Sequence, residues 1–174
     1  HQVLQMKDFS DQSVGVKMNW TVAKSGEVRN VIPADAMAYA DVRVLRVSDY
    51  DLLEPKVRER VKNQLIQDTK VEVKFTRGRP PLEMTPASEA LAKHAQGIYA
   101  ELDKKLIIGD KASGGGTDAA YAALKTKAPV IESLGVQGTG SHTADLEHIL
   151  IESIVPRLYL LTRMIMDISQ GKFQ

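Results

Sequence analysis

Hydrophobic and polar residues alternate along two stretches near the start of the chain, residues 14–24 and 36–46. A period of two predicts strands with one face buried. A short apolar stretch at 28–32 predicts a third strand between them. Because only short turns separate these segments, we expect an antiparallel sheet.

A four-residue hydrophobic period then predicts a helix around 53–65, followed by another alternating strand at 70–76. The start of this helix has two interpretations. Ser48 would cap a helix that carries Pro55 in its interior, whereas a start at Glu54 places the proline in the first turn. The order strand, strand, strand, helix, strand predicts an α/β unit with the helix on one face of the sheet.

The stiff segment Arg-Gly-Arg-Pro-Pro at 77–81 is the best domain boundary, dividing the chain into 1–79 and 80–174. Helices and strands alternate after it, which predicts an α/β domain with a mainly parallel sheet. A last helix is expected from a cap at Ser153 to about Ile168. The other expected elements are helices at 85–103 and 117–125 and strands at 106–108 and 129–134.

Composition narrows the possible functions. The net charge is +1, so nucleic acid is not an expected partner. The chain has no cysteine, which excludes disulfides, thiolate metal sites and thiol catalysis. No apolar run approaches the roughly 18 residues of a membrane span, so no membrane partner is expected. The chain begins at His1 rather than Met, and Val3, Leu4 and Met6 suggest the tail of an amphipathic helix. We therefore expect a piece of a longer protein.

A glycine turn is the first candidate site. Gly114, Gly115 and Gly116 precede Thr117 at the start of an expected helix. Backbone N–H groups at such a start can cradle an anion, and glycine lets a ligand approach closely. The alternative is a tight turn with Thr117 as the helix cap. The segment matches neither the dinucleotide-binding glycine fingerprint nor a P-loop.

His142 lies in a polar, glycine-flanked loop, where a core histidine is not expected. Imidazole is a common zinc ligand and general base. Asp145 or Glu147 could orient it, or could cap the next element. His148 and His94 are expected to have structural roles.

Arg43 faces away from the alanine and valine stripe of its strand. It could pair with Asp41 alone, or its planar fork could bind a carboxylate. Asn30, beside a proline bend, is either a turn residue or an amide directed at a ligand. Spacing decides neither case.

Five segments together resemble the C-terminal part of a dinuclear-zinc metallopeptidase. The family contains aminoacylase, succinyl-diaminopimelate desuccinylase, tripeptidase and bacterial glutamate carboxypeptidase, and the similarity is strongest to the last, the periplasmic folate-cleaving type. It covers nearly all of the chain. The segments are NWTVAKSGEVRNVIPADAMAYADVRVLR, TRGRPP, ASGGGTDAAYAAL, APVIESLGVQGTGSHTADLEHI and PRLYLLTRMIMDI.

The resemblance implies an α/β catalytic domain with two zinc ions, bridged by a carboxylate and a water. It also implies a sheet-and-helix domain, inserted into the first, that forms a homodimer. Residues 1–79 would be this dimerisation domain, incomplete at its N-terminus. Residues 80–174 would be the C-terminal part of the catalytic domain.

By the same resemblance, His142 matches the last zinc ligand of the family. Asn30 and Arg43 match residues that hold the terminal carboxylate of the substrate, and the loop Gly114–Thr117 matches one beside the substrate. The implied reaction is hydrolysis of a small peptide or N-acyl amino acid, in which zinc activates a water and polarises the scissile carbonyl.

The chain also departs from the family pattern, since it contains no His-x-Asp and no Glu-Glu motif. We therefore expect this chain alone to be inactive and not to hold zinc. The complete protein is expected to release a C-terminal amino acid, glutamate in particular. An aminoacylase or dipeptidase relative is the alternative enzyme, and a non-catalytic dimerisation fragment the alternative of another class. The resemblance favours a periplasmic or secreted location and leaves the cytoplasm open.

Overall fold

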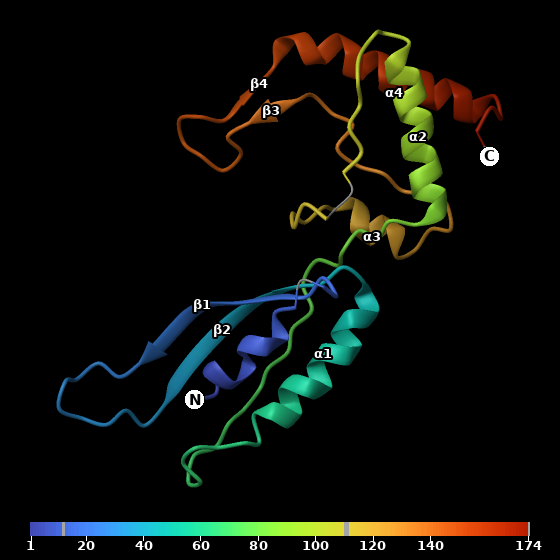
Figure 1. The fold of residues 1–174 in the computed structure, drawn as a ribbon. Helices are drawn as coiled ribbons and strands as arrows, with labels where there is room; N and C mark the ends of the chain where they lie inside the picture. The colour runs from blue at the N-terminus through green and yellow to red at the C-terminus, as the bar shows by residue number, and fades with distance from the viewer. Residues whose placement is uncertain (12, 110–111, 174) are drawn as a thin grey trace. The chain divides into compact units, whose positions relative to one another are not determined.

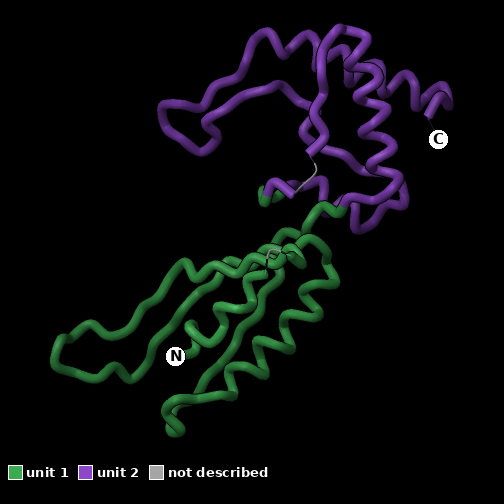
Figure 2. The backbone as a smooth tube through the Cα atoms, viewed as in Figure 1, with its two compact units in different colours: residues 1–83, 114–116 green, residues 84–113, 117–174 purple. Residues whose placement is uncertain are grey.

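The computed structural model describes residues 1–11, 13–109 and 112–173 (Figure 1). The chain divides into two compact units, coloured separately in Figure 2. Unit 1 comprises residues 1–83 and 114–116, and unit 2 comprises residues 84–113 and 117–174. The sequence places the boundary near the same point, but the assignment of the two parts to dimerisation and catalysis stays a prediction.

Unit 1 is built on the predicted antiparallel hairpin. Strands β1 (Lys17–Ser25) and β2 (Ala36–Arg43) pair with Lys17 opposite Arg43, and the register shifts between Trp20 and Val22. The inward faces of both strands contribute to a core with the short 3-10 helix η1 (Leu4–Phe9). The alternation of apolar residues therefore identified the buried face correctly at the end of the hairpin near Met18. Beyond the register shift, Val22 is 41% exposed, and Ala36 and Ala38 are also exposed.

Helix α1 (Val47–Arg60) covers the same core and settles the question of its start. It begins before Ser48, because the Asp49 carboxylate accepts a hydrogen bond of 2.9 Å from the Arg46 N–H at the first turn. Pro55 therefore lies inside the helix. Leu53 and Val57 are each 5% exposed, as their four-residue spacing predicts.

Two predicted strands of unit 1 are wrong. Residues 28–32 form a turn, with the Val31 N–H bonded to the Val28 carbonyl at 3.3 Å, and Ile32 is 94% exposed. Residues 70–76 do not form a strand, although Val71, Val73 and Phe75 pack in alternation against the core. Alternation records which side chains are buried, whereas a strand also requires a neighbour for its backbone.

Unit 2 is a helix pair with long irregular connections. Helix α2 (Pro86–Ala100) begins with a capping box, in which the Ser88 N–H donates to Thr85 Oγ1 at 3.1 Å and the Thr85 N–H donates to Ser88 Oγ at 3.2 Å. It packs against α4 (Ile154–Ser169). The core includes Ala95 and Ile98 of the stripe predicted for α2, packed with Leu160 and Met164 of α4. The apolar surface that the sequence predicts for α4 is instead exposed: Ile154, Val155, Leu158, Leu161, Ile165 and Ile168 are each at least 36% exposed.

The predicted parallel sheet is absent from the described part of unit 2. Its only regular strands there are the short antiparallel pair β3 (Gly138–Thr139) and β4 (His148–Ile149). Residues 106–108 and 129–134 are irregular, although Leu106 and Ile131 still pack on the helices. These apolar segments therefore pack in the core, but their backbones do not pair with a neighbouring strand.

Two smaller predictions also fail in detail. The helix expected at 117–125 is reduced to α3 (Ala119–Ala123), and the 3-10 helix η2 (Ile151–Ser153) leads into α4. Ser153 does lie at the N-cap position of α4, but its hydroxyl forms no cap hydrogen bond and donates backward to the Leu150 carbonyl at 2.6 Å. None of the helices in the described residues combines the length and hydropathy needed to cross a membrane.

Candidate functional site

Arg43 is the last residue of β2 and belongs to unit 1, as does the glycine segment Gly114–Gly116. Its Nε donates to Asp41 Oδ2 at 2.9 Å, and its Nη1 donates to the Gly114 carbonyl. The side chain is 52% exposed. Arg43 therefore pairs with Asp41, as one of the two interpretations predicts, and it also contacts the glycine segment. Its binding of a carboxylate stays a prediction.

The glycine segment depends on the absence of side chains at two positions. Gly114 has a φ of +79°, a conformation that costs other residues about 1–2 kcal/mol. A methyl group added at Gly116 would lie 3.0 Å from Cδ of Arg79 and 3.2 Å from its Nη1. Two guanidinium groups therefore lie against this short backbone segment.

Burial and the charges of Asp41 and Arg43 together affect the pKa of Tyr50, a residue of the core. Desolvation raises the pKa of Tyr50, and the negative charge of Asp41 raises it further. The positive charges of Arg77 and Arg43 act in the opposite direction. Tyr50 therefore stays protonated at neutral pH and is a packing residue beside the site, 8% exposed.

Thr117 belongs to unit 2, so the division between the units falls directly after Gly116. Its Oγ1 accepts a hydrogen bond of 3.2 Å from the Ala119 N–H, and its carbonyl accepts one of 3.3 Å from Ala120. The predicted helix cap at Thr117 is thus displaced by one residue, because the N-cap of α3 is Asp118 and Thr117 stabilises the turn before it. A helix as short as α3 provides little dipole for an anion.

His142 lies at the tip of the β3–β4 hairpin, with a φ of +68°. The hairpin is fixed below it, where Thr143 Oγ1 donates to the Gly140 carbonyl at 2.6 Å. A methyl group at Gly140 would lie 2.2 Å from the Leu146 carbonyl oxygen, so only glycine fits there. The tight turn holds the imidazole exposed to solvent.

No second residue supports His142 within the described part of the chain. Neither Asp145 nor Glu147 forms a hydrogen bond or ion pair with it there, and no group of three His, Asp or Glu side chains among the described residues could hold a metal. A catalytic zinc requires about three protein ligands. The residues described here therefore do not fit a zinc site by themselves.

The other two candidate histidines have structural contacts, as predicted. His148 Nδ1 lies 2.8 Å from the Leu146 carbonyl and its Nε2 lies 3.3 Å from Thr139 Oγ1, across the β3–β4 pair. His94 on α2 lies 3.2 Å from Asp167 Oδ2 on α4 and against the Phe173 ring. Both rings are held by the protein itself.

Asn30 is far from Arg43 within one chain. It lies in the exposed turn that connects β1 to β2, whereas Arg43 lies at the other end of β2. Eight residues of extended strand separate these ends by roughly 25 Å. Within unit 1 the structure therefore brings Arg43 and the glycine segment together and leaves Asn30 apart from them, whereas His142 belongs to unit 2.

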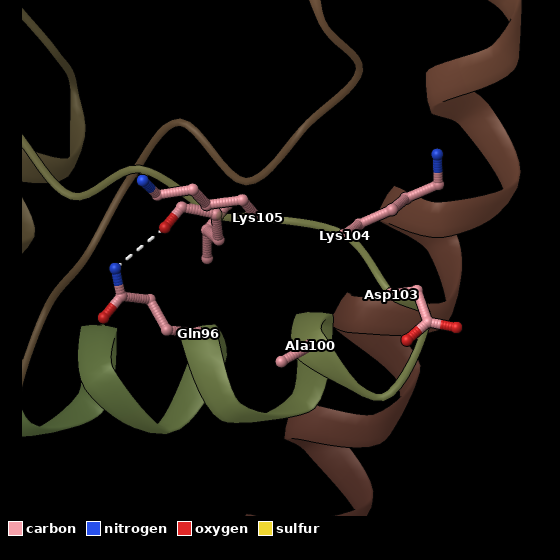
Figure 3. Close-up of a pocket in the computed structure, with 6 residues that line it drawn as sticks. Gln96, Ala100, Asp103, Lys104 and Lys105 are labelled. Atoms are coloured by element: carbon pink, nitrogen blue, oxygen red, sulfur yellow. Dashed lines mark hydrogen bonds between the residues drawn. The ribbon is translucent and has the colours of Figure 1, made fainter.

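A shallow pocket lies at the C-terminal end of α2 (Figure 3). Gln96 donates from its Nε2 to the Leu106 carbonyl at 2.8 Å across it. The remaining lining residues are Ala100, Asp103, Lys104 and Lys105. None of the predicted site residues lines this pocket, and it contains no nucleophile with an adjacent base.

Sequence reasoning missed one residue of the site. Arg79 was considered only as part of the Arg-Gly-Arg-Pro-Pro boundary, yet its side chain lies against Gly116. The sequence did contain a signal for Arg79, because a connector between domains needs no charged residues and this one has two arginines before its proline pair. Spacing alone could not connect Arg79 to a glycine turn more than 30 residues away.

Comparison with known proteins adds to this geometry. The sequence pattern of peptidase family M20/M25/M40 matches residues 6–167. Carboxypeptidase G2 of Pseudomonas sp. (strain RS-16) is 41% identical over 170 residues, which cover 98% of this chain and 40% of that relative. The chain thus spans about two fifths of the length of the curated relative it matches. Because the family match includes β2, the glycine segment and the His142 hairpin, this chain belongs to peptidase family M20/M25/M40.

Proposed function

We propose that this chain is the C-terminal part of a zinc-dependent carboxypeptidase that hydrolyses an amide bond and releases a C-terminal amino acid, glutamate in particular. Membership of the M20/M25/M40 peptidase family supports peptide hydrolysis. The similarity to a protein named Carboxypeptidase G2 supports release from the carboxyl end. The active protein would be longer than 174 residues.

The observation that carries this proposal is the contact of Arg43 with the glycine segment. Arg43 uses Nε for Asp41 and Nη1 for the Gly114 carbonyl. Asp41 fixes the plane of the guanidinium, so its orientation is set before a ligand arrives. A carboxylate that displaced the glycine carbonyl would gain a charge-assisted pair of hydrogen bonds. Arg43 would in this way hold the terminal carboxylate of the substrate.

Arg79 favours glutamate as the released residue. Its side chain lies against Gly116, so the glycine segment is flanked by Arg79 as well as by Arg43. Glutamate presents two carboxylates, and two guanidinium groups match that charge. A neutral C-terminal amino acid would need only Arg43.

Zinc stays part of the proposal for the complete protein. Within this chain His142 would supply one metal ligand, and the other ligands would come from residues outside it. When bound, zinc would supply an activated water and polarise the scissile carbonyl. The described residues do not hold the metal by themselves.

A homodimer would explain the separate positions of Asn30 and Arg43. If both residues bind one substrate carboxylate, a second copy must bring its Asn30 to the Arg43 of the first. The hairpin is too long for a single chain to do this.

Arg43→Ala in the complete protein tests the proposal. We expect kcat/KM for an N-acyl glutamate to fall at least about tenfold, because a lost charge-assisted hydrogen bond costs about 1.5–3 kcal/mol. A substrate with an amidated α-carboxylate should show no such difference between the variant and the wild type. Asp41→Asn is the matched control. It keeps Arg43, so we expect a smaller loss of kcat/KM.

Arg79→Ala should lower kcat/KM for a glutamate substrate more than for the corresponding alanine substrate. Equal losses on both substrates would remove the case for glutamate. An unchanged kcat/KM in Arg43→Ala would mean that Arg43 only stabilises the hairpin.

A further inference from the structure

Arg157 on α4 is a buried charge, with 8% of its surface exposed. Its contacts are weak for such a position. Nη1 donates to the Ser133 carbonyl at 3.4 Å, which is long for an N–H···O bond, and the guanidinium lies 5.3 Å from the centre of the Tyr99 ring. Nε is buried without a hydrogen-bond partner.

No carboxylate in the described part of the chain forms an ion pair with Arg157. Asp167, on the same helix and also buried, shows the usual arrangement. It lies 2.7 Å from Arg163, 3.2 Å from His94 and 3.5 Å from Lys172. A buried charge without a partner is costly, and one ring face with one distant carbonyl offsets only part of that cost.

The apolar surface beside Arg157 is also exposed to solvent. Residues on the neighbouring turns of α4 form an exposed apolar row, which we call the outer face of α4. Such a row is typical of a surface that another polypeptide segment contacts. Its members and their exposed fractions are Ile154 (39%), Leu158 (63%), Leu161 (36%) and Ile165 (67%).

We propose that Arg157 is the receptor for a carboxylate that none of the described residues supplies, carried by a polypeptide segment that packs on the outer face of α4. The donor would accept hydrogen bonds from the unsatisfied guanidinium while apolar side chains next to it cover the row. The chain spans 40% of the length of Carboxypeptidase G2, and we assign the segment to the rest of a protein of that length, not to a second copy of this chain or a separate partner. This proposal does not depend on the hydrolytic reaction.

Thermal unfolding of Arg157→Met tests it in the 174-residue chain and in the complete protein. Methionine fills similar space without a charge. We expect the variant to raise Tm of the 174-residue chain by at least about 2 °C, because the unpaired charge is removed. In the complete protein the same substitution should lower Tm, because it leaves the donor carboxylate without its partner. Arg163→Met, which removes an arginine already paired within the chain, should lower Tm in both.

Acetate and phosphate, compared with chloride at equal ionic strength, show whether a free anion could serve instead. One outcome is that either anion raises Tm of the wild-type 174-residue chain and leaves Tm of Arg157→Met unchanged. That result would support Arg157 as a receptor for an oxyanion, but it would overturn the assignment of that oxyanion to a polypeptide segment. The proposal is overturned if Arg157→Met shifts Tm in the same direction in both chains and neither anion distinguishes it from the wild type. Arg157 would then be satisfied by Ser133 and Tyr99.

Discussion

The Arg43 region and the His142 hairpin differ in how much of their surroundings this chain provides. Arg43 has a carboxylate beside it, a backbone carbonyl ahead of it and a second arginine near the same glycine segment. His142 has a well-defined turn beneath it and no acidic partner in the described residues. Both depend on glycines with positive φ, Gly114 and Gly140.

The difference concerns the kind of ligand that we propose for each region. A carboxylate can be bound by one prearranged guanidinium, so a single region of one chain suffices. A metal ion requires several protein ligands that meet at one point, and these are often distant in sequence. The proposed carboxylate site can therefore be complete in a chain that supplies only part of the proposed metal site.

The largest expected effect concerns activity of the 174-residue chain itself. With added zinc it should release no glutamate from an N-acyl glutamate above the buffer rate, because one histidine cannot hold a catalytic zinc. His142→Ala should behave like the unsubstituted chain in the same assay. Glutamate release by pure chain that disappears in His142→Ala would show that the metal site is complete after all.

Complementation between two inactive variants of the complete protein tests whether Asn30 acts from a second copy. Asn30→Ala and Arg43→Ala, mixed under conditions of subunit exchange, would form about half mixed dimers with one intact site each, restoring about a quarter of the wild-type activity. The separate variants, treated identically, are the controls. If the mixture is no more active than its components, Asn30 and Arg43 do not share a site across subunits.

Alanine substitution at the two strained glycines compares the two loops directly. Gly114→Ala meets no atom within 4 Å, so its cost should come from the backbone alone, about 1–2 kcal/mol of unfolding free energy. Gly140→Ala should cost more, because its methyl group would meet the Leu146 carbonyl at 2.2 Å. Urea unfolding measures both. Equal losses would mean that the His142 turn is less constrained than its geometry indicates.

The smallest expected effect is a pH dependence of stability in unit 2. This unit leaves His142 exposed, but charged pairs connect its helices. Desolvation opposes ionisation of Asp167, but the charges of Arg163 and Lys172 outweigh it and lower its pKa. A lowered pKa in the folded state contributes stability above the unfolded value of about 3.9, and this contribution is lost as the pH falls through the folded pKa.

Glu101 responds in the same sense, since a hydrogen bond from Tyr159 and then one from Arg163 lower its pKa. The Tm of the wild type should therefore fall more steeply below about pH 4 than that of Asp167→Asn. Parallel curves for the two proteins would show that Asp167 does not contribute to acid sensitivity.

Elements with their own periodic signal were predictable from the sequence. Helices α1 and α2 bury the face that their apolar spacing indicates, and the β1–β2 hairpin does so at its end near Met18. Helix α4 differs, because it buries Arg157, Leu160, Met164 and Asp167 and exposes most of its apolar residues. The predicted strands at 70–76 and 129–134 bury the right side chains but do not form ladders. Side-chain burial is encoded locally, whereas a ladder depends on a neighbouring backbone that local sequence does not specify.

By itself the sequence determined the family, through the glycine turn and the His142 loop, and the amphipathic elements that form each core. Only the tertiary structure decided that Arg43 contacts Gly114, that Arg79 lies against Gly116 and that Arg157 is buried without a carboxylate among the described residues. The reason is distance along the chain, since residues more than 30 positions apart meet only when packing brings their elements together. The residue type determines the chemistry of a side chain, but the tertiary structure determines which groups it contacts.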